Sequence, residues 1–490
     1  MFSSRVRPLG VASAAFVGVA SLGIATSLMP GEAGPGIVTA AIRMLNTEAW
    51  VMGGSGTPIP PPAYIDAVMN LFIDPQSPFE GQPVFPVDSA NGLVTPEGLY
   101  PTTGVKSLPV DTSISQGVAI LNNTIDQQMA AGNNMVVFGY SQSSVIASQE
   151  MNNLLDLPAG QQPSADQLSF VLIGDVSNPN GGLFSRFDVP GLPLTAPSLG
   201  LTFSGATPSD TPWDTAIYSA EYDGFSDFPK YPLNLISDIN ALLGSFTVHG
   251  SYPGMTPAEL ATAIPLDTSD DYTGHTHYFM IPTNYLPILE PLLGVPVIGQ
   301  SLYDLLEPDM RILVNLGYGN INYGWDQGPA NVATPFGVFP DVNINTLLSA
   351  LGAGAQQGID AFDSDLSHLS IAGAASAAGN AMAEPSAGLF PDGLPSLSEF
   401  VNTFTYVTST AYATLLPTAD IMNALFTTVP AYQVELFFDE LNSGNLVDAL
   451  GMPLAAGVGL DSFSAALEIP VLMNAFSGIT GALDNLFFEA

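Results

Sequence analysis

The stretch that most constrains the fold of this chain is residues 135–144, Met-Val-Val-Phe-Gly-Tyr-Ser-Gln-Ser-Ser. An apolar run ends in Gly-x-Ser-x-Ser, and a segment with helical spacing follows at once. This pattern is typical of a serine nucleophile on a tight turn between a strand and a helix. Small residues must flank such a serine because the turn leaves no room for side chains, and the free N–H groups of the helix can face an oxyanion. The stretch therefore predicts a nucleophile at Ser141.

Apolar runs alternate with helical patterns over the first two thirds of the chain. Strands are expected near residues 48–52, 136–138, 170–173, 215–222 and 278–281, and helices near residues 64–72, 113–131, 145–154 and 304–317. Such alternation predicts a parallel sheet with helices on both faces, in which ligands bind at the carboxyl ends of the strands. Ser141, Asp175, Asp223 and the glycine loop Gly53–Gly56 each follow a predicted strand. We expect them to share one edge of the sheet.

A nucleophilic serine needs a base, and the base needs a carboxylate that orients it. The usual order in α/β-hydrolases is serine, acid, histidine. It does not choose among the histidines of this chain, because all four follow Ser141, namely His249, His275, His277 and His368. We favour Asp223 and His249, since Asp223 follows a strand end and lies a short way before His249. Asp227 in the same loop is the rival acid, and Asp175 ranks third.

The other histidines and the glycine loop suggest alternatives. His275 and His277 form a His-x-His pair that could bind a metal, but the sequence signals no third ligand. We expect a structural role for the pair, a surface position for His368, and neither a metal nor a cofactor. The loop Gly53–Thr57 has neither the lysine of a P-loop nor the spacing of a dinucleotide fingerprint. It is interpreted either as a source of an oxyanion-hole amide or as a tight turn.

Composition excludes several classes of function. The 490 residues include 45 acidic and 7 basic ones, so the net charge of −38 would repel nucleic-acid phosphates. Apolar residues make up 47% of the chain, which is enough for a sizeable core. The chain has no cysteine, so disulfides, thiolate metal ligands and a cysteine nucleophile are excluded.

The two ends of the chain differ from its middle. Arg5 and Arg7 precede an uncharged apolar segment, residues 9–29, which fits a cleaved secretory signal or a retained membrane anchor. We expect a secreted or cell-envelope protein, associated with the membrane through this segment if it is retained. Beyond residue 330 Ala, Gly, Leu and Ser dominate, and Pro and acidic residues interrupt every candidate membrane span. The predicted parts are a signal or anchor (1–30), an α/β-hydrolase domain (31–330) and a mostly helical region (331–490) that caps the site or binds lipid or a partner.

Several motifs resemble a known family. The turn from Gly139 to Ser143 is similar to the Gly-Tyr-Ser-Gln-Gly turn of cutinases, with Ser143 in place of the last glycine. More specifically, the chain resembles the PE-PPE C-terminal hydrolase domain of mycobacterial and related actinobacterial envelope proteins over roughly residues 48–325. The motifs that carry this resemblance are residues 53–58 (Gly-Gly-Ser-Gly-Thr-Pro), the serine turn, 178–182 (Asn-Pro-Asn-Gly-Gly), 222–229 (Tyr-Asp-Gly-Phe-Ser-Asp-Phe-Pro), 304–308 (Asp-Leu-Leu-Glu-Pro) and 316–319 (Leu-Gly-Tyr-Gly).

The resemblance implies a serine enzyme that acts on acyl esters. Ser141 would be the nucleophile, Asp223 the acid, and His249, in a His-x-x-Tyr setting, the base. Gln142 would give its backbone N–H to the oxyanion hole, and Ser55 of the glycine loop is our choice for the second donor. Water as acceptor would make an esterase or lipase, and a sugar hydroxyl would make an acyltransferase onto glycolipids such as trehalose esters. The alternative is a non-catalytic cell-envelope interaction protein that keeps a hydrolase shell.

Overall fold

A computed structural model describes residues 46–368 and 396–487 of the chain. The predicted signal or anchor segment, residues 1–30, lies outside the described residues, and that prediction stays open. The described residues belong to one compact unit.

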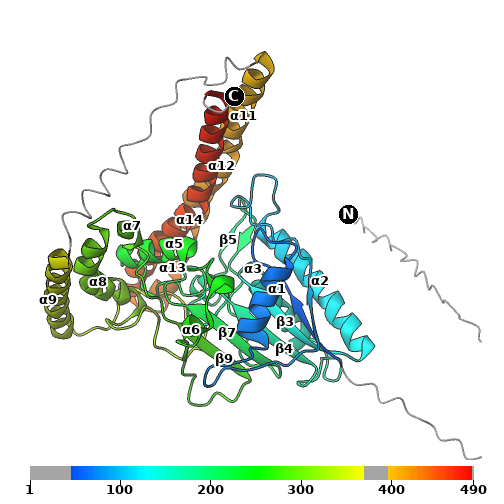
Figure 1. Ribbon diagram of the computed structural model, residues 1–490. Coiled ribbons are helices and arrows are strands. Elements are labelled where there is room, and N and C mark those ends of the chain that lie inside the picture. Colours follow the sequence, from blue (N-terminus) through cyan, green and yellow to red (C-terminus); the bar gives the residue numbers. More distant parts are fainter. Residues whose placement is uncertain (1–45, 369–395, 488–490) are drawn as a thin grey trace, which may run out of the picture. The chain divides into compact units, whose positions relative to one another are not determined.

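A seven-stranded sheet forms the centre of this unit, in the order β2-β1-β3-β4-β7-β9-β8 (Figure 1). All neighbours pair in parallel except β8, which runs antiparallel to β9. The strands are β1 Thr47–Val51, β2 Ser89–Gly92, β3 Asn134–Tyr140, β4 Leu168–Ile173, β7 Asp214–Ala220, β8 Ile264–Pro265 and β9 Thr276–Ile281. A separate antiparallel ribbon consists of β5 Thr195–Ala196 and β6 Leu201–Thr202. The predicted α/β fold with a mainly parallel sheet is confirmed.

Both faces of the sheet are buried, because neighbouring residues of a strand point to opposite sides. In β3, Val137 packs into one core, which also contains residues of α2 and α3, whereas Val136 and Phe138 pack into the other core with α1. Helix α2 supplies Leu121 and Ile125 to the first core, as its amphipathic spacing predicts. This double burial explains why the central strands are continuous apolar runs rather than alternating ones.

Helices alternate with the strands along the chain, and all described elements after β9 are helical. The helices of the α/β part are α1 Pro62–Val68, α2 Val110–Ala131, α3 Gln142–Leu155, α4 Leu183–Arg186, α5 Leu235–Thr247, α6 Pro257–Leu260, α7 Glu290–Leu293 and α8 Gly299–Asn315. Single turns of other helix types are η1 Met69–Ile73, η2 Tyr252–Gly254 and η3 Leu316–Tyr318. The C-terminal elements are α9 Ile344–His368, α11 Leu397–Ala413, α12 Leu415–Asn423, η4 Ala424–Thr428, α13 Val429–Asn442 and α14 Leu446–Phe487.

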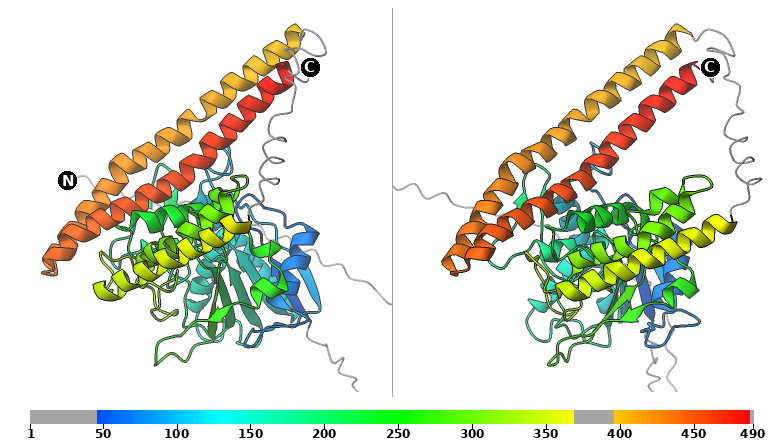
Figure 2. Two further views of the ribbon diagram at one scale, coloured as in Figure 1. Left: turned by 60° about the vertical axis from the view of Figure 1, so that its left-hand side comes forward. Right: turned by 90° about the vertical axis from the view of Figure 1, so that its left-hand side faces the viewer.

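The elements α11 to α14 form a long helical hairpin, in which α14 runs back beside α13 and α11 (Figure 2). Helix α14 continues through Pro453 and Pro470. Among the described residues it is the one helix long and apolar enough to cross a membrane, judged by length and composition alone. The expectation that proline interrupts every candidate span was therefore wrong for this segment. A proline removes one backbone hydrogen bond and kinks a helix, but packing of the flanking turns can keep the helix continuous.

The helical hairpin shares a core with the α/β part. Leu460, Phe463 and Leu467 of α14 belong to the same buried cluster as Phe187, and the rings of Phe463 and Phe203 lie 5.9 Å apart. The Tyr432 hydroxyl donates a hydrogen bond to the carbonyl oxygen of Phe187 (3.1 Å). These contacts hold α13 and the middle of α14 against the α/β part.

Candidate active site

The predicted serine turn joins β3 to α3. Ser141 is the residue before α3 and has φ 58° and ψ −118°, a conformation that non-glycine residues rarely adopt. Gly139 is required here, because a Cβ at this position would lie 2.8 Å from the carbonyl oxygen of Ser143. The turn places the Ser141 side chain at the carboxyl end of the sheet, the position that serine nucleophiles occupy on turns of this kind.

Ser143 occupies the position at which cutinases have a second glycine. Its Oγ accepts a hydrogen bond from the backbone N–H of Tyr140 (2.8 Å) and lies 3.1 Å from the carbonyl oxygen of Tyr140, to which it donates. The side chain is fully buried, and both of its hydrogen-bonding roles are used. The hydroxyl therefore closes the turn from inside, so the departure from glycine is compatible with the turn.

Ser141, His249 and Asp223 lie in one hydrogen-bonded row. Nε2 of His249 is 2.8 Å from Oγ of Ser141, and Nδ1 of His249 is 2.7 Å and 2.9 Å from the two carboxylate oxygens of Asp223. The three side chains come from the loops after β3, β7 and α5. This is the geometry in which a histidine removes the proton of a serine while a carboxylate orients its ring. The catalytic roles of the three residues remain a prediction.

The Asp223 carboxylate is fully buried and has several donors besides His249. It accepts hydrogen bonds from the backbone N–H of Phe225 (2.9 Å), the hydroxyl of Ser226 (2.8 Å) and the hydroxyl of Tyr252 (2.8 Å). Burial alone would raise the pKa of Asp223, but the attraction of His249 and these hydrogen bonds outweigh it, so the pKa lies below its ordinary value. Asp223 therefore stays ionised beside the imidazole.

Ser226 and Tyr252 were not assigned roles from the sequence. The signal for Tyr252 was the His-x-x-Tyr spacing, since residues three apart around a short turn can both reach one carboxylate. Ser226 follows Asp223 at a spacing typical of a tight Asx-type turn, a signal too common to single it out.

The rival acids have other partners. One carboxylate oxygen of Asp227 accepts the backbone N–H of Tyr222 (3.0 Å), and burial raises the pKa of Asp227 well above its ordinary value despite this hydrogen bond and the nearby Arg186. Asp175 accepts hydrogen bonds from the Thr207 hydroxyl (2.6 Å) and the backbone N–H of Ser177 (3.0 Å). Within residues 46–368 and 396–487, no hydrogen bond joins either carboxylate to His249. The geometry thus favours Asp223.

The imidazole of His249 is held by its neighbours. The ring of Tyr140 stacks on it with centroids 5.4 Å apart and planes inclined by 29°, and the Phe225 ring lies 4.7 Å away. The Tyr140 hydroxyl also donates to the carbonyl oxygen of His249 (2.6 Å). A Cβ on Gly174, which has φ 53°, would lie 3.0 Å from Cε1 of His249. The ring therefore has little room to leave the row.

The two predicted oxyanion donors are neighbours of the serine. In the part of the chain that the structure describes, the backbone N–H groups of Gln142 and Ser55 donate to no protein acceptor. A Cβ on Gly54 would lie 3.3 Å from Cβ of Ser141, so the glycine loop passes directly beside the nucleophile. The Gln142 side chain donates to the Ser55 hydroxyl (3.2 Å) and to the carbonyl oxygen of Gly98 (2.8 Å), and these contacts connect the loop to α3. Oxyanion binding by these groups remains a prediction.

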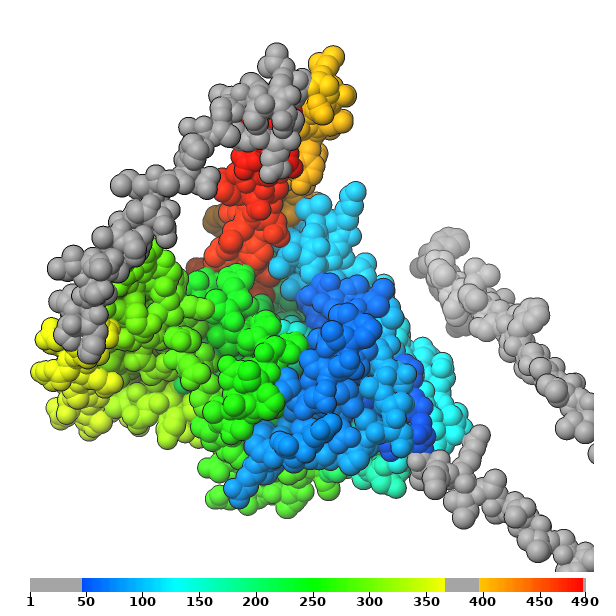
Figure 3. Space-filling view, in the orientation of Figure 1, coloured from blue at the N-terminus to red at the C-terminus, as the bar shows by residue number. Residues whose placement is uncertain are grey.

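A cavity of about 480 Å³ opens beside Ser141 and His249. Its walls are mostly apolar and include Val110, Ile114, Val145, Val176, Leu183, Phe184, Leu201, Phe225 and Phe246. Helix α14 completes them with Phe463, Ala466, Leu467, Pro470 and Asn474. In Figure 3 the surface of α14, in red, adjoins the segments near residues 100 and 245 that line the cavity with it.

The remaining histidines lie elsewhere. Nδ1 of His275 is 3.3 Å from a carboxylate oxygen of Asp214, and both side chains are exposed. His277 is an exposed residue of β9, and His368 is the last residue of α9, with a side chain outside the described part. Among the described residues, no three His, Cys, Asp or Glu side chains are grouped so that they could hold a metal ion.

Comparison with known proteins identifies the family. The sequence model of the PE-PPE domain matches residues 86–319. The chain is 42% identical over 454 residues to an uncharacterised PPE family protein, PPE28 of Mycobacterium tuberculosis. This alignment covers 89% of the present chain and 67% of PPE28. The chain belongs to the PE-PPE family.

Some of the relatives that the chain matches have an activity in their names, among them an esterase and an acyltransferase. The chain is 46% identical over 292 residues to a protein named esterase PE16 of Mycobacterium tuberculosis. This alignment covers 60% of the present chain and 51% of PE16. The chain is 26% identical over 247 residues to the diacyltrehalose acyltransferase Chp2 of the same organism, covering 49% of this chain and 66% of that protein. The chain thus spans about half the length of the esterase.

Proposed function

We propose that this PE-PPE protein is a serine enzyme that acts on acyl esters through Ser141, His249 and Asp223. The observation that carries the proposal is the hydrogen-bonded row of these three side chains at the mouth of an apolar cavity. The cavity size lies in the range of about 300–1,000 Å³ that is usual for small-molecule pockets. Its apolar walls suit an acyl chain, and the Ser141 hydroxyl lies beside the place that the ester carbonyl would take.

The first half of the reaction forms an acyl-enzyme. Nε2 of His249 takes the proton of the Ser141 hydroxyl as Oγ bonds to the ester carbonyl carbon. The carbonyl oxygen becomes an oxyanion that the N–H groups of Gln142 and Ser55 stabilise. The ester C–O bond then breaks, and the alcohol leaves with the proton held by His249. Asp223, whose pKa lies below its ordinary value, remains a carboxylate and stabilises the imidazolium.

The second half transfers the acyl group to an acceptor hydroxyl. His249 takes a proton from the acceptor, whose oxygen attacks the acyl carbon; the bond to Oγ of Ser141 breaks and the proton returns to that oxygen. Water as acceptor releases a fatty acid, as an esterase or lipase does. A sugar hydroxyl yields a new ester, as in an acyltransferase that acts on trehalose glycolipids. The names of the relatives include both outcomes, and the first half of the proposed reaction is the same for either.

Incubation of the purified protein with acylated and free trehalose, followed by mass spectrometry, separates the two outcomes. Free fatty acid alone supports the esterase, and acyl chains redistributed among trehalose molecules support the acyltransferase. Absence of both products opposes the proposal and favours a non-catalytic envelope protein that keeps the hydrolase fold.

We further propose that the protein acts outside the cytoplasm, at the cell envelope or secreted, without nucleic-acid partners. This proposal is in line with its acidic charge and its N-terminal segment.

A further inference from the structure

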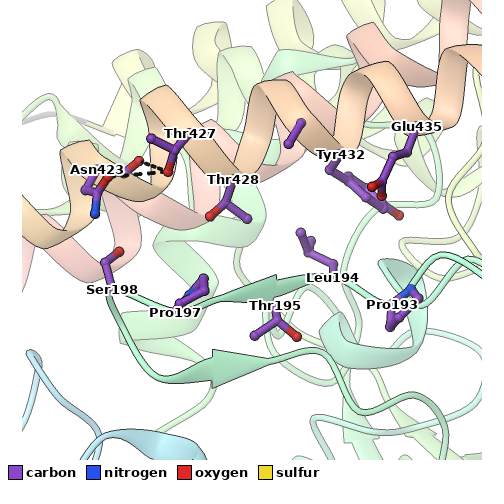
Figure 4. A pocket seen from close by; sticks show the side chains of 11 residues that line it. Pro193, Leu194, Thr195, Pro197, Ser198, Asn423, Thr427, Thr428, Tyr432 and Glu435 are labelled. Atoms are coloured by element: carbon purple, nitrogen blue, oxygen red, sulfur yellow. Dashed lines mark hydrogen bonds between the residues drawn. The ribbon is translucent and has the colours of Figure 1, made fainter. Parts of the chain in front are cut away.

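The cavity beside Ser141 continues into further hollows along the helical hairpin. A small apolar cavity of about 20 Å³ lies behind Leu201 and Phe463, since both side chains line it and also line the cavity beside Ser141. An open groove of about 430 Å³ follows, which shares Leu194 and Thr428 with the small cavity (Figure 4). The three hollows therefore form a row that begins at the serine and ends at the surface.

We propose that this row is a channel for a long acyl chain, and that Phe463 with Leu201 forms the partition that sets the accepted chain length. The proposal rests on the proposed function, because it places the carbonyl end of the chain at Ser141. The substrate class would be esters of long-chain fatty acids, whose acyl group exceeds the space in front of the partition.

The chemistry of the lining changes along the row in a way that suits such a chain. The small cavity is bounded almost wholly by apolar side chains from the β5–β6 ribbon and from the helical hairpin, including Leu194, Leu199, Ala424, Val429 and Leu460. The groove is more polar at its rim, where Figure 4 shows Ser198, Asn423 and Glu435 around the helix η4–α13 and the ribbon. The middle part of a bound hydrocarbon chain would thus be shielded from water, and its far end would lie in the open groove at the protein surface.

Phe463 has the larger of the two side chains in the proposed partition. The Phe463 ring is mostly buried and packs against Phe203 on the ribbon side. The segment of α14 that carries it is held against α5 by a hydrogen bond from the Ser462 hydroxyl to the Asp238 carboxylate (3.5 Å). Gly459 also approaches Phe187 closely, since a Cβ there would lie 2.6 Å from the ring. A change of the Phe463 rotamer would therefore open the row without moving α14.

Phe463 lies outside residues 86–319, to which the family domain matches, whereas Leu201 lies inside them. Because Phe463 belongs to α14, the accepted chain length would depend on the C-terminal hairpin as well as on the matched family domain. Chain-length preference is then expected to change through α14 while the residues around Ser141 stay the same.

The experiment measures how fast the full chain is labelled at Ser141 by ethyl, octyl and hexadecyl fluorophosphonates. Phe463→Ala should raise the hexadecyl-to-octyl rate ratio by about tenfold or more, because each methylene that gains burial contributes about fourfold. Phe463→Trp, which enlarges the partition, should lower the same ratio. Phe438→Ala is the matched control, since Phe438 is an exposed phenylalanine of the same hairpin that lines none of the three hollows.

The ratio is compared only among variants with wild-type circular dichroism spectra, and Phe463→Leu replaces Phe463→Ala if the latter unfolds. An unchanged ratio in both the smaller and the larger variant at position 463, with normal ethyl labelling, overturns the channel. A change of equal size in Phe438→Ala overturns it as well. Failure of every probe to label the wild type refutes the proposed function itself and is distinct from both results.

Discussion

Nε2 of His249 lies 2.8 Å from Oγ of Ser141, at the carboxyl end of the central sheet. The relationship is preformed, because the backbone turn at Ser141, the stacked ring of Tyr140 and the carboxylate of Asp223 each fix one partner. Preformed geometry of this kind lowers the cost of reaching the transition state.

Replacement of the acid tests which carboxylate orients the imidazole. Asp223→Asn should lower kcat for p-nitrophenyl butyrate by about 10²–10⁴, as loss of the triad carboxylate does in other serine enzymes. Asp227→Asn is the matched control and should cost far less, because Asp227 receives the N–H of Tyr222 and not the imidazole. An equal or reversed loss, measured on folded protein, would give the acid role to Asp227.

Tyr252→Phe tests the support of Asp223. The variant loses the hydroxyl that donates to Asp223 and leaves the backbone N–H of Ala220 without its acceptor (2.7 Å), so unfolding free energy should fall by about 1–3 kcal/mol. With one donor fewer, the pKa of Asp223 should rise. The stability from ionised Asp223 is present above the ordinary carboxyl pKa and is lost as pH falls through the lowered folded pKa. The variant should therefore lose this contribution at a higher pH than the wild type in acid titrations followed by circular dichroism, and coinciding acid transitions would contradict the assignment.

The buried carboxyl group of Glu97 should make the free energy of unfolding depend on pH between about 4.5 and 8. Burial raises the pKa of Glu97 to about 8, against a smaller lowering by the Thr95 hydroxyl, which donates to Oε1 (2.6 Å). The folded state thus keeps a proton that the unfolded state releases near pH 4.5, and stability falls as pH rises from there to about 8. Glu97→Gln should match the wild type at low pH and exceed its unfolding free energy by roughly 4 kcal/mol at pH 8. A difference that is the same at both pH values in urea titrations would exclude this cause.

Gly139→Ala tests the serine turn. The added Cβ would lie 2.8 Å from the carbonyl oxygen of Ser143 and 2.9 Å from Cα of Ser144, so the turn must shift and the Ser141 hydroxyl with it. We expect kcat/KM to fall by about 10² or more, since small displacements of a nucleophile have effects of this order. Gly352→Ala in α9, where a Cβ meets nothing within 4 Å, is the control and should keep full activity. Wild-type kcat/KM in Gly139→Ala would mean that the turn does not position Ser141.

The sequence predicted the parts of the site that depend on strand ends. Ser141, Asp223 and the glycine loop each follow an apolar run, and the carboxyl ends of parallel strands must share one edge of the sheet. His249 follows a helix, and its choice among four histidines rested on its short separation from Asp223 and on family resemblance. The hydrogen bond from Ser226 to Asp223 was not predictable, because a serine in a loop gives no signal of its partner.

The part played by α14 was beyond sequence reasoning for a different reason. Phe463 and Leu467 have the spacing of any buried helix face, and nothing local shows that this face covers a cavity formed by residues far earlier in the chain. Pro453 and Pro470 favoured a broken segment, whereas tertiary packing keeps the helix continuous. Contacts of this kind are set by the fold as a whole.

The most direct measurement is labelling of the purified full chain with a fluorophosphonate probe, followed by peptide mass spectrometry. The account predicts that the wild type is labelled at Ser141 and that Ser141→Ala, with an unchanged circular dichroism spectrum, is not labelled. Labelling of Ser141→Ala at the wild-type rate, or modification of another serine in the wild type, would contradict the claim that Ser141 is the nucleophile.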